Sequence, residues 1–277
     1  MKSARDTSLP AEAASSNLVK IKLTIAYDGA NYHGWQAQKT EDTVQQRVEK
    51  VLRRFFPSVD RIHGSSRTDK GVHAYGMVAH AEFPRAEFRI TIHQLLLALN
   101  AFLPEDIRIV RVQRAPSSFH ARFDSVGKQY RYQLWNHRAF NPIMRGLTWH
   151  VPVKLDLMQM KQASKHFLGR QDFRSLATKQ DYKIANTTRT LYRCDVRASG
   201  PLVTFVIEGD GFLYKMCRSI VGTLCLVGQG KQEADAIPKL LAQKARQYAG
   251  MSAPAQGLTL YKVYYSPPAN WPKQVDR

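Results

Sequence analysis

One short segment of the chain combines the residue types that nucleophilic chemistry needs. Residues 64–74 read Gly-Ser-Ser-Arg-Thr-Asp-Lys-Gly-Val-His-Ala, which places the carboxylate of Asp69 between Arg67 and Lys70. Nearby cations favour the ionised form of an aspartate, and an ionised carboxylate can act as a nucleophile. The flanking glycines supply the backbone freedom for a sharp turn that approaches a ligand closely. Taken alone, the segment is explained as well by an ordinary polar turn in which Asp69 accepts backbone hydrogen bonds.

The chain is strongly basic, which limits its partners. Its 277 residues include 41 Lys and Arg against 22 Asp and Glu, a formal net charge of +19. A surplus of this size indicates a polyanionic partner or an anionic surface. Membrane attachment is the weaker option, because no apolar run approaches the roughly 18 residues of a spanning helix and no lipidation motif occurs. Arginines and lysines adjoin Tyr and Phe in several places, a mixture that favours nucleic acid.

Cysteine usage and the first residues indicate a cytoplasmic protein. Cys194, Cys217 and Cys225 form no close Cys-x-x-Cys pair, which argues against a disulfide framework and against a cysteine zinc site. Reduced cysteines are typical of the cytosol. Residues 1–17 are rich in Ala and Ser, lack the apolar core of a secretory signal and are expected to form a flexible tail.

Metal and phosphate-loop chemistry are disfavoured. Asp69 and His73 are four residues apart, with His63 and His80 nearby, so a carboxylate–histidine metal site can be drawn. The surrounding sequence is typical of loop and strand, which removes the argument from one helix face. No Gly-x-x-x-x-Gly-Lys-Ser/Thr pattern occurs. We therefore expect no metal site.

Hydrophobic periodicity predicts an α+β fold, and the first half of the chain shows its plan. Residues 18–27 alternate apolar and polar side chains as a half-buried strand does, and Thr43 can cap a helix with apolar residues at helical spacing. The predicted order is strand, helix, strand, strand, helix, strand, the split βαβ or ferredoxin-like arrangement. These elements are expected at residues 18–27, 43–55, 61–64, 77–83, 91–102 and 107–112.

The second half repeats this plan. Strands are expected at residues 130–135, 191–196, 202–207 and 258–265, and helices at 155–168, 214–227 and 234–248. Two tandem ferredoxin-like, RRM-like halves would give two mainly antiparallel sheets with helices on one face of each, and the opposite faces would form a central RNA-binding cleft. The predicted organisation is a tail at 1–17, a first domain with the Asp69 loop at 18–115 and a second domain at 116–277.

The second half supplies further candidates for the site. Basic and aromatic side chains mix in Phe119-His120-Ala121-Arg122-Phe123 and in Lys128-Gln129-Tyr130-Arg131-Tyr132. On a strand, Tyr130 and Tyr132 point to the same face, where stacking of a base on a tyrosine contributes roughly 1–3 kcal/mol. A place in the hydrophobic core explains both tyrosines equally well. Lys215 and Arg218 stand at the start of an apolar helix, which a solvated helix end would also explain.

Together these segments resemble the TruA family of tRNA pseudouridine synthases. The resemblance rests on the Asp69 segment and on five further blocks, which fall in order and at family-like separations between residues 20 and 265. The blocks are Tyr27-Asp28-Gly29 through Gly34-Trp35-Gln36, Phe119-His120-Ala121-Arg122, Tyr130-Arg131-Tyr132, Asn136-His137-Arg138 and residues 216–222. Any one block alone is unspecific, whereas the combination is specific.

The resemblance implies a fold, an activity and a set of site residues. Such enzymes have two ferredoxin-like halves, act as homodimers and isomerise uridine to pseudouridine in the anticodon arm of tRNA, at the family's positions 38, 39 and 40, without a cofactor. By position, Asp69 matches the nucleophile and Arg67 the residue that displaces the target base. Tyr130 and Leu258 match the residues on either side of the uracil, and Arg218 matches the partner of the aspartate. The resemblance also implies substrate contacts from Lys70, His73, Phe119, His120, Arg122 and Lys215.

The chain departs from the family pattern in three places. Ser66 stands where the family usually has glycine before the arginine, and Lys70 stands where it has a small residue after the aspartate. A Phe-x-Ser-Phe type segment becomes Phe173-Arg174-Ser175-Leu176. These differences bear on loop geometry and target range and leave the nucleophile intact.

The chemistry of this isomerisation fits the residue types. The bond from uracil N1 to ribose C1′ must break, the base must rotate, C5 must bond to C1′, and the C5 proton must leave. A carboxylate can attack C1′ or C6, or assist glycal formation, and the sequence leaves these routes open. Tyr130 is a candidate for the final deprotonation, although a phenol with a pKa of about 10 is a poor base unless perturbed.

Two other functions stay open at this point. A noncatalytic RNA-binding protein with paired RRM-like sheets would share the basic and aromatic residues. A glycoside-cleaving enzyme would also use Asp69 as a nucleophile, but it normally needs a second carboxylate as the acid, and no clear acidic partner is present.

Overall fold

The computed structural model describes residues 17–178, 186–245, 249–269 and 271. Its strands are β1 (Leu18–Tyr27), β2 (His63–Gly64), β3 (His73–Pro84), β4 (Ile107–Ala115), β5 (Gly127–Trp135), β6 (Trp149–His150), β7 (Gly169–Asp172), β8 (Thr188–Ser199), β9 (Leu202–Gly209) and β10 (Leu258–Tyr264). Its α-helices are α2 (Val44–Phe55), α3 (Ile92–Phe102), α4 (Leu157–Lys165), α5 (Met216–Gly228) and α6 (Ile237–Gln243).

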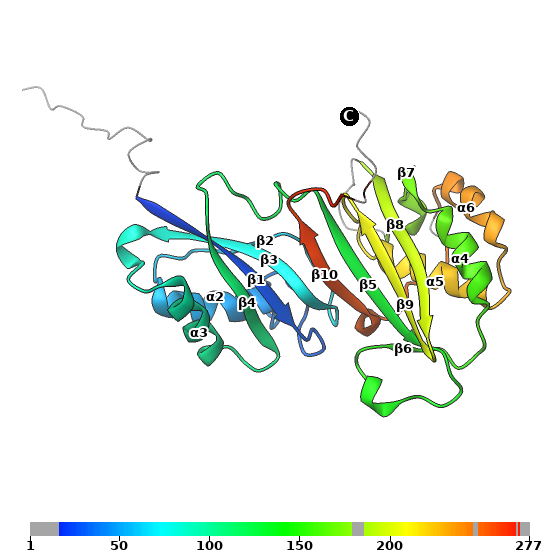
Figure 1. Cartoon of the computed structure of the whole chain (residues 1–277), viewed down its shortest axis with the longest axis horizontal. Coiled ribbons are helices and arrows are strands. Elements are labelled where there is room, and N and C mark those ends of the chain that lie inside the picture. Colours follow the sequence, from blue (N-terminus) through cyan, green and yellow to red (C-terminus); the bar gives the residue numbers. More distant parts are fainter. Residues whose placement is uncertain (1–16, 179–185, 246–248, 270, 272–277) are drawn as a thin grey trace, which may run out of the picture.

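The strands form a mixed, mostly antiparallel sheet. Its order is β4-β1-β3-β10-β5-β9-β8-β7, with β2 paired to β3 and β6 to β5. The described pairs are antiparallel except β3–β10 and β5–β6. Figure 1 shows α2 and α3 with the first half of the chain and α4, α5 and α6 with the second, so that β3 and β10 lie between the two groups of helices.

Local sequence accounts for the helices of the first half. Thr43 caps α2 by accepting a hydrogen bond from the amide of Gln46, and the apolar positions of the helix are buried on one face. The helix ends at Phe55, and Pro57 follows. A capping box of Thr91 and Gln94 begins α3. Both helices and all four strands predicted for this half are therefore confirmed, with shifted ends.

The expectation of two separate sheets is wrong, because one continuous sheet spans both halves. The join is short: Thr259 pairs with His73 and Leu260 with Ala74, in parallel register. Strand β10 pairs with β5 along one edge, and its other edge would otherwise present unpaired backbone groups. Pairing with β3 satisfies these groups at the start of that edge and places the Asp69 loop beside the second half.

The second half contains the predicted strands and helices with some differences. The helix expected at residues 234–248 is a 3₁₀ turn, Ala234–Ala236, followed by α6, which ends at Gln243. The next residue, Lys244, is in the left-handed region with φ of 51°. Residues 246–248 lie outside the described residues, as do residues 1–16 of the expected tail. Strands β6 and β7 are too short and too polar for periodicity to have predicted them.

The segment that links the halves is fixed to the first half. The buried Lys20 ammonium pairs with Glu82 at 2.5 Å and donates to the carbonyl oxygens of Ser117 and Phe119 at 2.5 and 2.7 Å. The amide of Ala121 donates to Nδ1 of the buried His80 at 3.1 Å. The link is therefore packed on β1 and β3 before the chain enters β5.

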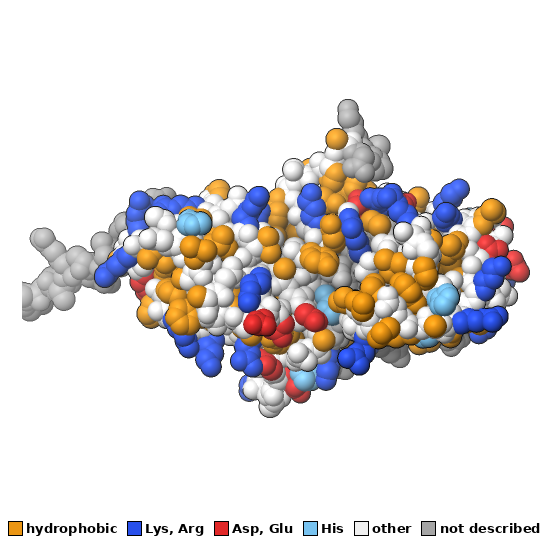
Figure 2. Space-filling model, turned by 60° about the horizontal axis from the view of Figure 1, so that its bottom comes forward, with side chains coloured by type: hydrophobic (Ala, Val, Ile, Leu, Met, Phe, Trp, Pro, Cys, Tyr) orange, Lys and Arg blue, Asp and Glu red, His pale blue; other side chains and the backbone are white. Residues whose placement is uncertain are grey.

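The surface carries the positive charge of the sequence on both halves. Figure 2 shows Lys and Arg side chains spread along one face of the molecule, while the acidic side chains gather in fewer places. A polyanion lying along this face would meet cations over its whole length. Among the described residues, no helix combines the length and the apolar character needed to span a membrane.

Candidate functional site

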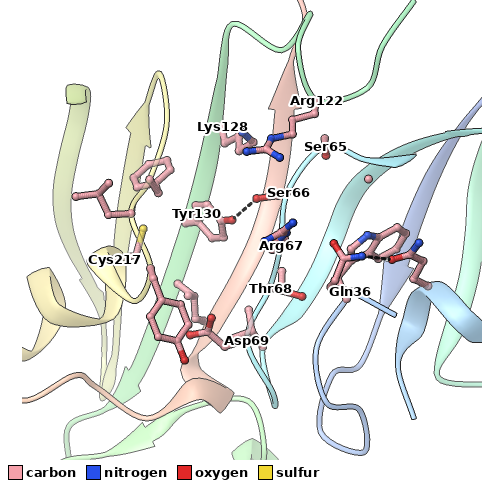
Figure 3. A pocket seen from close by; sticks show the side chains of 18 of the residues that line it. Gln36, Ser65, Ser66, Arg67, Thr68, Asp69, Arg122, Lys128, Tyr130 and Cys217 are labelled. Atoms are coloured by element: carbon pink, nitrogen blue, oxygen red, sulfur yellow. Dashed lines mark hydrogen bonds between the residues drawn. The ribbon is translucent and has the colours of Figure 1, made fainter. Parts of the chain in front are cut away.

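A cleft of about 1060 Å³ lies where the two halves meet. Met216 and Cys217 of α5 line it together with Tyr130 of β5, so the cleft opens on the side of the sheet that α5 covers. We had expected the RNA-binding groove on the sheet faces opposite the helices, and this expectation is wrong. The space exists because β3 and β10 pair over only two residues and the halves separate beyond them. Figure 3 shows the segment from Ser65 to Asp69 and residues of the second half facing each other across the cleft.

The Asp69 loop is held in place by the chain that follows β1. Gly34 has a φ of +85°, and a Cβ there would lie 2.3 Å from the carbonyl oxygen of Thr68. Only glycine permits both the conformation and this close approach. The hydroxyls of Tyr27 and Thr68 are 2.8 Å apart in the core. Gly71, with a φ of +77°, donates its amide to the carbonyl oxygen of Tyr32 at 3.3 Å.

The Asp69 carboxylate forms an ion pair across the cleft. Nη1 of Arg218 lies 2.9 Å from Oδ2 of Asp69, and the two side chains are 13% and 19% exposed. Nε of Arg218 donates to the carbonyl oxygen of Ala253 at 2.7 Å, which fixes the plane of the guanidinium. Oδ1 of Asp69 has no hydrogen-bond partner among the described residues. One carboxylate oxygen is thus anchored, the other has no hydrogen-bond partner in the described part of the chain, and the residue lines the cleft.

Tyr130 forms the wall above the carboxylate. Its hydroxyl lies 2.9 Å from Oγ of Ser66, and its ring meets Phe212 edge-on at 5.1 Å between centroids. Burial, with the nearby Cys217 and Asp69, raises the pKa of Tyr130 above its ordinary value. This direction keeps the phenol protonated, so it speaks against Tyr130 as the base that removes the C5 proton. Ser66, a departure from the family pattern, supplies the partner for the Tyr130 hydroxyl.

Arg67 and Leu258 complete the inner cleft. Arg67 is exposed, forms no ion pair with a described residue and lies between Tyr130 and Gln36 in Figure 3. Leu258 is buried at the start of β10 and pairs with Tyr132 of β5. The structure therefore brings Asp69, Arg67, Tyr130, Leu258 and Arg218 together, although they come from distant parts of the sequence.

Four other predicted contact residues line the outer cleft: Lys70, His120, Arg122 and Lys215. Nζ of Lys70 lies 2.7 Å from Nε2 of His33, at the edge of the cleft. Lys215 has a φ of 60° and precedes α5, with its ammonium 4.9 Å from the centre of the Tyr214 ring. A left-handed conformation is uncommon for lysine and is often found at functional sites.

His73 and Phe119 do not line the cleft, which corrects their expected role in substrate binding. His73 is 5% exposed. Its Nδ1 accepts the amide of Gly29 at 3.1 Å, and its Nε2 lies 2.9 Å from the carbonyl oxygen of Gly146. Phe119 packs against Tyr265, at 5.2 Å between ring centroids. Both side chains fasten the chain near the site, His73 from a buried position and Phe119 from a half-buried one.

Three further cations line the cleft and were not among the predicted site residues: Arg61, Lys128 and Arg189. Lys128 precedes Tyr130 by two residues on β5, so strand alternation places both side chains on one face and would have found it. Arg189 lies at the start of β8 and has no local signal. Cys217 also lines the cleft, but burial raises the pKa of its thiol well above the ordinary value, so it is no thiolate nucleophile.

Among the described residues, no group of three or more His, Cys, Asp or Glu side chains is arranged to hold a metal ion. Within the cleft, Asp69 is the only described carboxylate among the lining residues. An acid–base pair of carboxylates, as glycoside cleavage normally uses, is therefore not found in this part of the molecule.

Comparison with known proteins adds a family. Residues 23–124 and 163–266 match the family model described as tRNA pseudouridine synthase. The tRNA pseudouridine synthase A of Geobacillus kaustophilus is 43% identical over 248 residues, which cover 89% of this chain and 94% of that protein. Those of Ruminiclostridium cellulolyticum and Acetivibrio thermocellus are 40% and 41% identical, over 89% and 88% of this chain and 99% of each relative. One chain in a solved Cbf5-Nop10-Gar1 complex aligns with 92% of this chain, and the alignment covers 51% of that chain. The sequence identity is 14% and the TM-score is 0.37, so the likeness is too weak to bear on the fold.

Proposed function

The chain belongs to the tRNA pseudouridine synthase A family and has its activity, and we propose that Asp69 is the nucleophile of this isomerisation, acting on a uridine of the anticodon stem-loop. The observation that carries the proposal is the unequal environment of the two carboxylate oxygens. Oδ2 accepts from Arg218 at 2.9 Å, while Oδ1 has no hydrogen-bond partner among the described residues, and Asp69 is one of the residues that line the cleft. A carboxylate fixed through one oxygen presents the other in a constant position.

The surroundings of Asp69 suit a base that has left its helix. Flipping a base out of its stack requires a few kcal/mol. Stacking on Tyr130 recovers roughly 1–3 kcal/mol of this, and Leu258 supplies an apolar wall. Arg67 is exposed and without an ion-pair partner among the described residues, so its guanidinium is free to fill the space that the uridine leaves.

The same arrangement serves each route to pseudouridine. Attack of Oδ1 on C6 of uracil or on C1′ of ribose, and assistance to a glycal, all need one free carboxylate oxygen beside the nucleoside. Arg218 stays paired with Oδ2 throughout. Its positive charge compensates the negative charge of Asp69, which would otherwise be unfavourable in a partly buried site. The released uracil then turns against the Tyr130 ring, and C5 meets C1′.

Asp69→Asn tests the proposal, because it keeps the shape of the side chain and an acceptor for Arg218 but removes the nucleophilic carboxylate. We expect pseudouridine formation in unmodified tRNA to fall by roughly 10⁴-fold or more, while tRNA binding stays within several-fold of wild type. The products are mapped by chemical labelling of pseudouridine and reverse transcription. Asp42→Asn is the matched control, because this aspartate also pairs with an arginine, Arg47, but does not line the cleft.

Each alternative gives a different result in this assay. Stops in the anticodon arm that disappear in Asp69→Asn support the proposal, and full activity of that variant contradicts it. Release of free uracil would indicate glycoside cleavage. A wild-type protein that binds tRNA and yields no pseudouridine would indicate a noncatalytic RNA-binding protein.

We extend the proposal to target positions, organisation and assembly. The target uridines are positions 38, 39 and 40 of tRNA, as the family resemblance implies. Residues 18–115 and 116–277 form two ferredoxin-like units. The strand orders β4-β1-β3-β2 and β10-β5-β9-β8 support this view, because the first and third strands of each unit lie in its centre. The enzyme acts in the cytoplasm as a homodimer. Light scattering of the purified protein tests the dimer, and the positions of the stops test the target.

A further inference from the structure

An exposed aromatic ring stands at the outer end of the cleft and has no role in the site described above. Phe123 lines the cleft and is 74% exposed. One face of its ring stacks on His120, at 4.2 Å between centroids and 29° between planes. The guanidinium carbon of Arg122 lies 5.8 Å from the centre of the same ring. Leaving a phenylalanine this exposed is unfavourable unless something covers it, and a ring already supported on one face is held ready to stack on the other.

Three cations surround the same end of the cleft: Arg122, Lys128 and Arg189. Figure 3 shows Lys128 and Arg122 next to each other beyond Tyr130 and Ser66. No ion pair joins any of the three cations to a carboxylate among the described residues. Asp210 is the acidic group that acts on Lys128, and its Oδ1 already accepts the amide of Thr190 at 3.0 Å.

The Lys128 charge is unfavourable in the free protein. The pKa of Lys128 is lowered to about 8. Burial is the largest cause and the positive charges of Arg122 and Arg189 add to it, whereas the negative charge of Asp210 acts in the opposite direction. An anion placed among the three cations would reverse this effect, because it favours the protonated amine.

We propose that this end of the cleft is a second nucleotide subsite, in which the Phe123 ring stacks on an unpaired base and Arg122, Lys128 and Arg189 bind the phosphate that joins this nucleotide to the target uridine. The inference rests on the proposed function and adds the neighbouring nucleotide to it. Lys128 and Tyr130 are two residues apart on β5, hence about 7 Å apart. A single nucleotide spans such a distance, so a phosphate bound at Lys128 fits the nucleotide next to a uracil on Tyr130. Arg122, whose charge acts on Lys128, directly precedes Phe123 in the chain, so a base stacked on Phe123 is assigned to that neighbouring nucleotide.

A double-mutant cycle between protein and RNA tests the stacking. Anticodon stem-loop RNAs are made with an abasic residue directly 5′ or directly 3′ of the target uridine. We expect kcat/KM of wild type to fall about 5- to 150-fold on one of the two abasic RNAs, the range for one base–aromatic stack. On the intact RNA, Phe123→Ala should lose as much kcat/KM as wild type loses on that abasic RNA. Combining the variant with the abasic RNA should lower kcat/KM little further. The loss should appear in KM, because stacking contributes equally to ground and transition states.

Controls separate stacking from general damage. Phe123→Trp should retain kcat/KM on the intact RNA. Phe102→Ala is the matched control, because Phe102 is also an exposed phenylalanine beside an arginine, Arg54, but lies on α3 outside the cleft. Independent, additive effects of Phe123→Ala and of both abasic positions would overturn the subsite. Wild-type protein without activity on the intact RNA would instead contradict the proposed function itself.

Proton uptake tests the phosphate half of the subsite. Binding of tRNA is followed by calorimetry at pH 8 in buffers of different ionisation enthalpy, in the Asp69→Asn background so that no turnover occurs. Protonation of a half-ionised Lys128 on binding predicts uptake of about half a proton. This uptake should vanish in Lys128→Arg with affinity retained, and in Lys128→Met with affinity reduced. Lys50→Met, an exposed lysine on α2, is the control and should keep the uptake. Equal uptake in the Lys128 variants and wild type would overturn the phosphate assignment.

Discussion

At the scale of single residues, the Asp69–Arg218 pair decides what the site can do. Nη1 of Arg218 binds Oδ2 of Asp69, and Nε of the same guanidinium binds the carbonyl oxygen of Ala253. A guanidinium presents both donors at once in a fixed plane, whereas an ammonium binds as a point charge. The arginine therefore positions the carboxylate as well as balancing its charge.

Arg218→Met and Arg218→Lys separate positioning from charge. Removing one member of a buried, hydrogen-bonded pair typically costs 2–5 kcal/mol, so we expect kcat of Arg218→Met to fall by roughly 100-fold or more. Arg218→Lys keeps the charge but loses the contact with Ala253, so its kcat should lie between wild type and Arg218→Met. Single-turnover kinetics on unmodified tRNA measure both variants. A lysine variant as slow as the methionine variant would assign the whole effect to positioning.

The residues of the inner site were largely predictable, and the errors have a physical cause. Asp69, Arg67, Tyr130 and Arg218 belong to the motif blocks, and Leu258 was matched by its position. Arg218 pairs with Asp69, and the other four residues line one cleft. His73 and Phe119 were expected in the cleft but do not line it. A motif identifies a segment of the chain, whereas the direction in which each side chain points depends on packing partners far along the sequence. The buried contacts of these two residues are made with such distant segments.

At the scale of elements, the strand-to-loop segment after β1 acts as the support of the Asp69 loop. The amide of Trp35 donates to the carbonyl oxygen of Thr68 at 3.3 Å, and Gly34 touches the same peptide. The loop thus keeps its shape through backbone contacts that any change at Gly34 would disturb.

Gly34→Ala should displace the loop, because its Cβ would lie 2.3 Å from the carbonyl oxygen of Thr68. Gly200→Ala is the matched control: Gly200 also has a positive φ, of 57°, but a Cβ there would have no atom within 4 Å. The left-handed conformation alone costs roughly 1–2 kcal/mol in either variant. We expect urea unfolding to show a larger loss for Gly34→Ala, and kcat to fall at least about tenfold in that variant alone. Equal stability and full activity of both variants would show that the contact is not needed.

Strand and helix positions followed from periodicity and capping, but the cleft between them did not. Thr43 and Thr91 begin helices as predicted, because capping is a local interaction. The join of β3 to β10 depends on two pairs of residues nearly two hundred positions apart, and no local pattern encodes such a contact. The expectation of two sheets with a groove on their open faces failed for this reason.

At the scale of the whole molecule, the link between the halves is bonded to a group that responds to acid. His80 is buried on β3, and its Nδ1 accepts the amide of Ala121 from the link. The pKa of His80 is lowered from 6.5 to about 4. Burial is the largest cause, and the charges of His120, Lys20 and His63 add to it, whereas Glu82 raises the pKa. The folded protein thus keeps this imidazole neutral where the unfolded chain would protonate it.

Stability should therefore fall as the pH falls from 6.5 to 4. Above pH 6.5, His80 is neutral in both the folded and the unfolded protein, so protonation does not reduce the free energy of unfolding. Between pH 6.5 and 4, the unfolded chain binds a proton at His80 that the folded protein does not, and this favours unfolding. The loss should reach roughly 3 kcal/mol at the acid end. Urea unfolding across this range measures it. His80→Asn keeps an acceptor for Ala121 and does not titrate, so its stability should depend less steeply on pH. An equally steep dependence in this variant would assign the effect to other groups.

The position of β10 in the sheet has a consequence for synthesis on the ribosome. Arg218 follows Asp69 by 149 residues, and β10, which joins the halves, follows Arg218 in the chain. A nascent chain therefore cannot assemble the working centre until β10 has left the ribosome. Truncated products that end before Leu258 should accordingly be inert toward RNA modification, so unfinished chains do not act on the cell's tRNA.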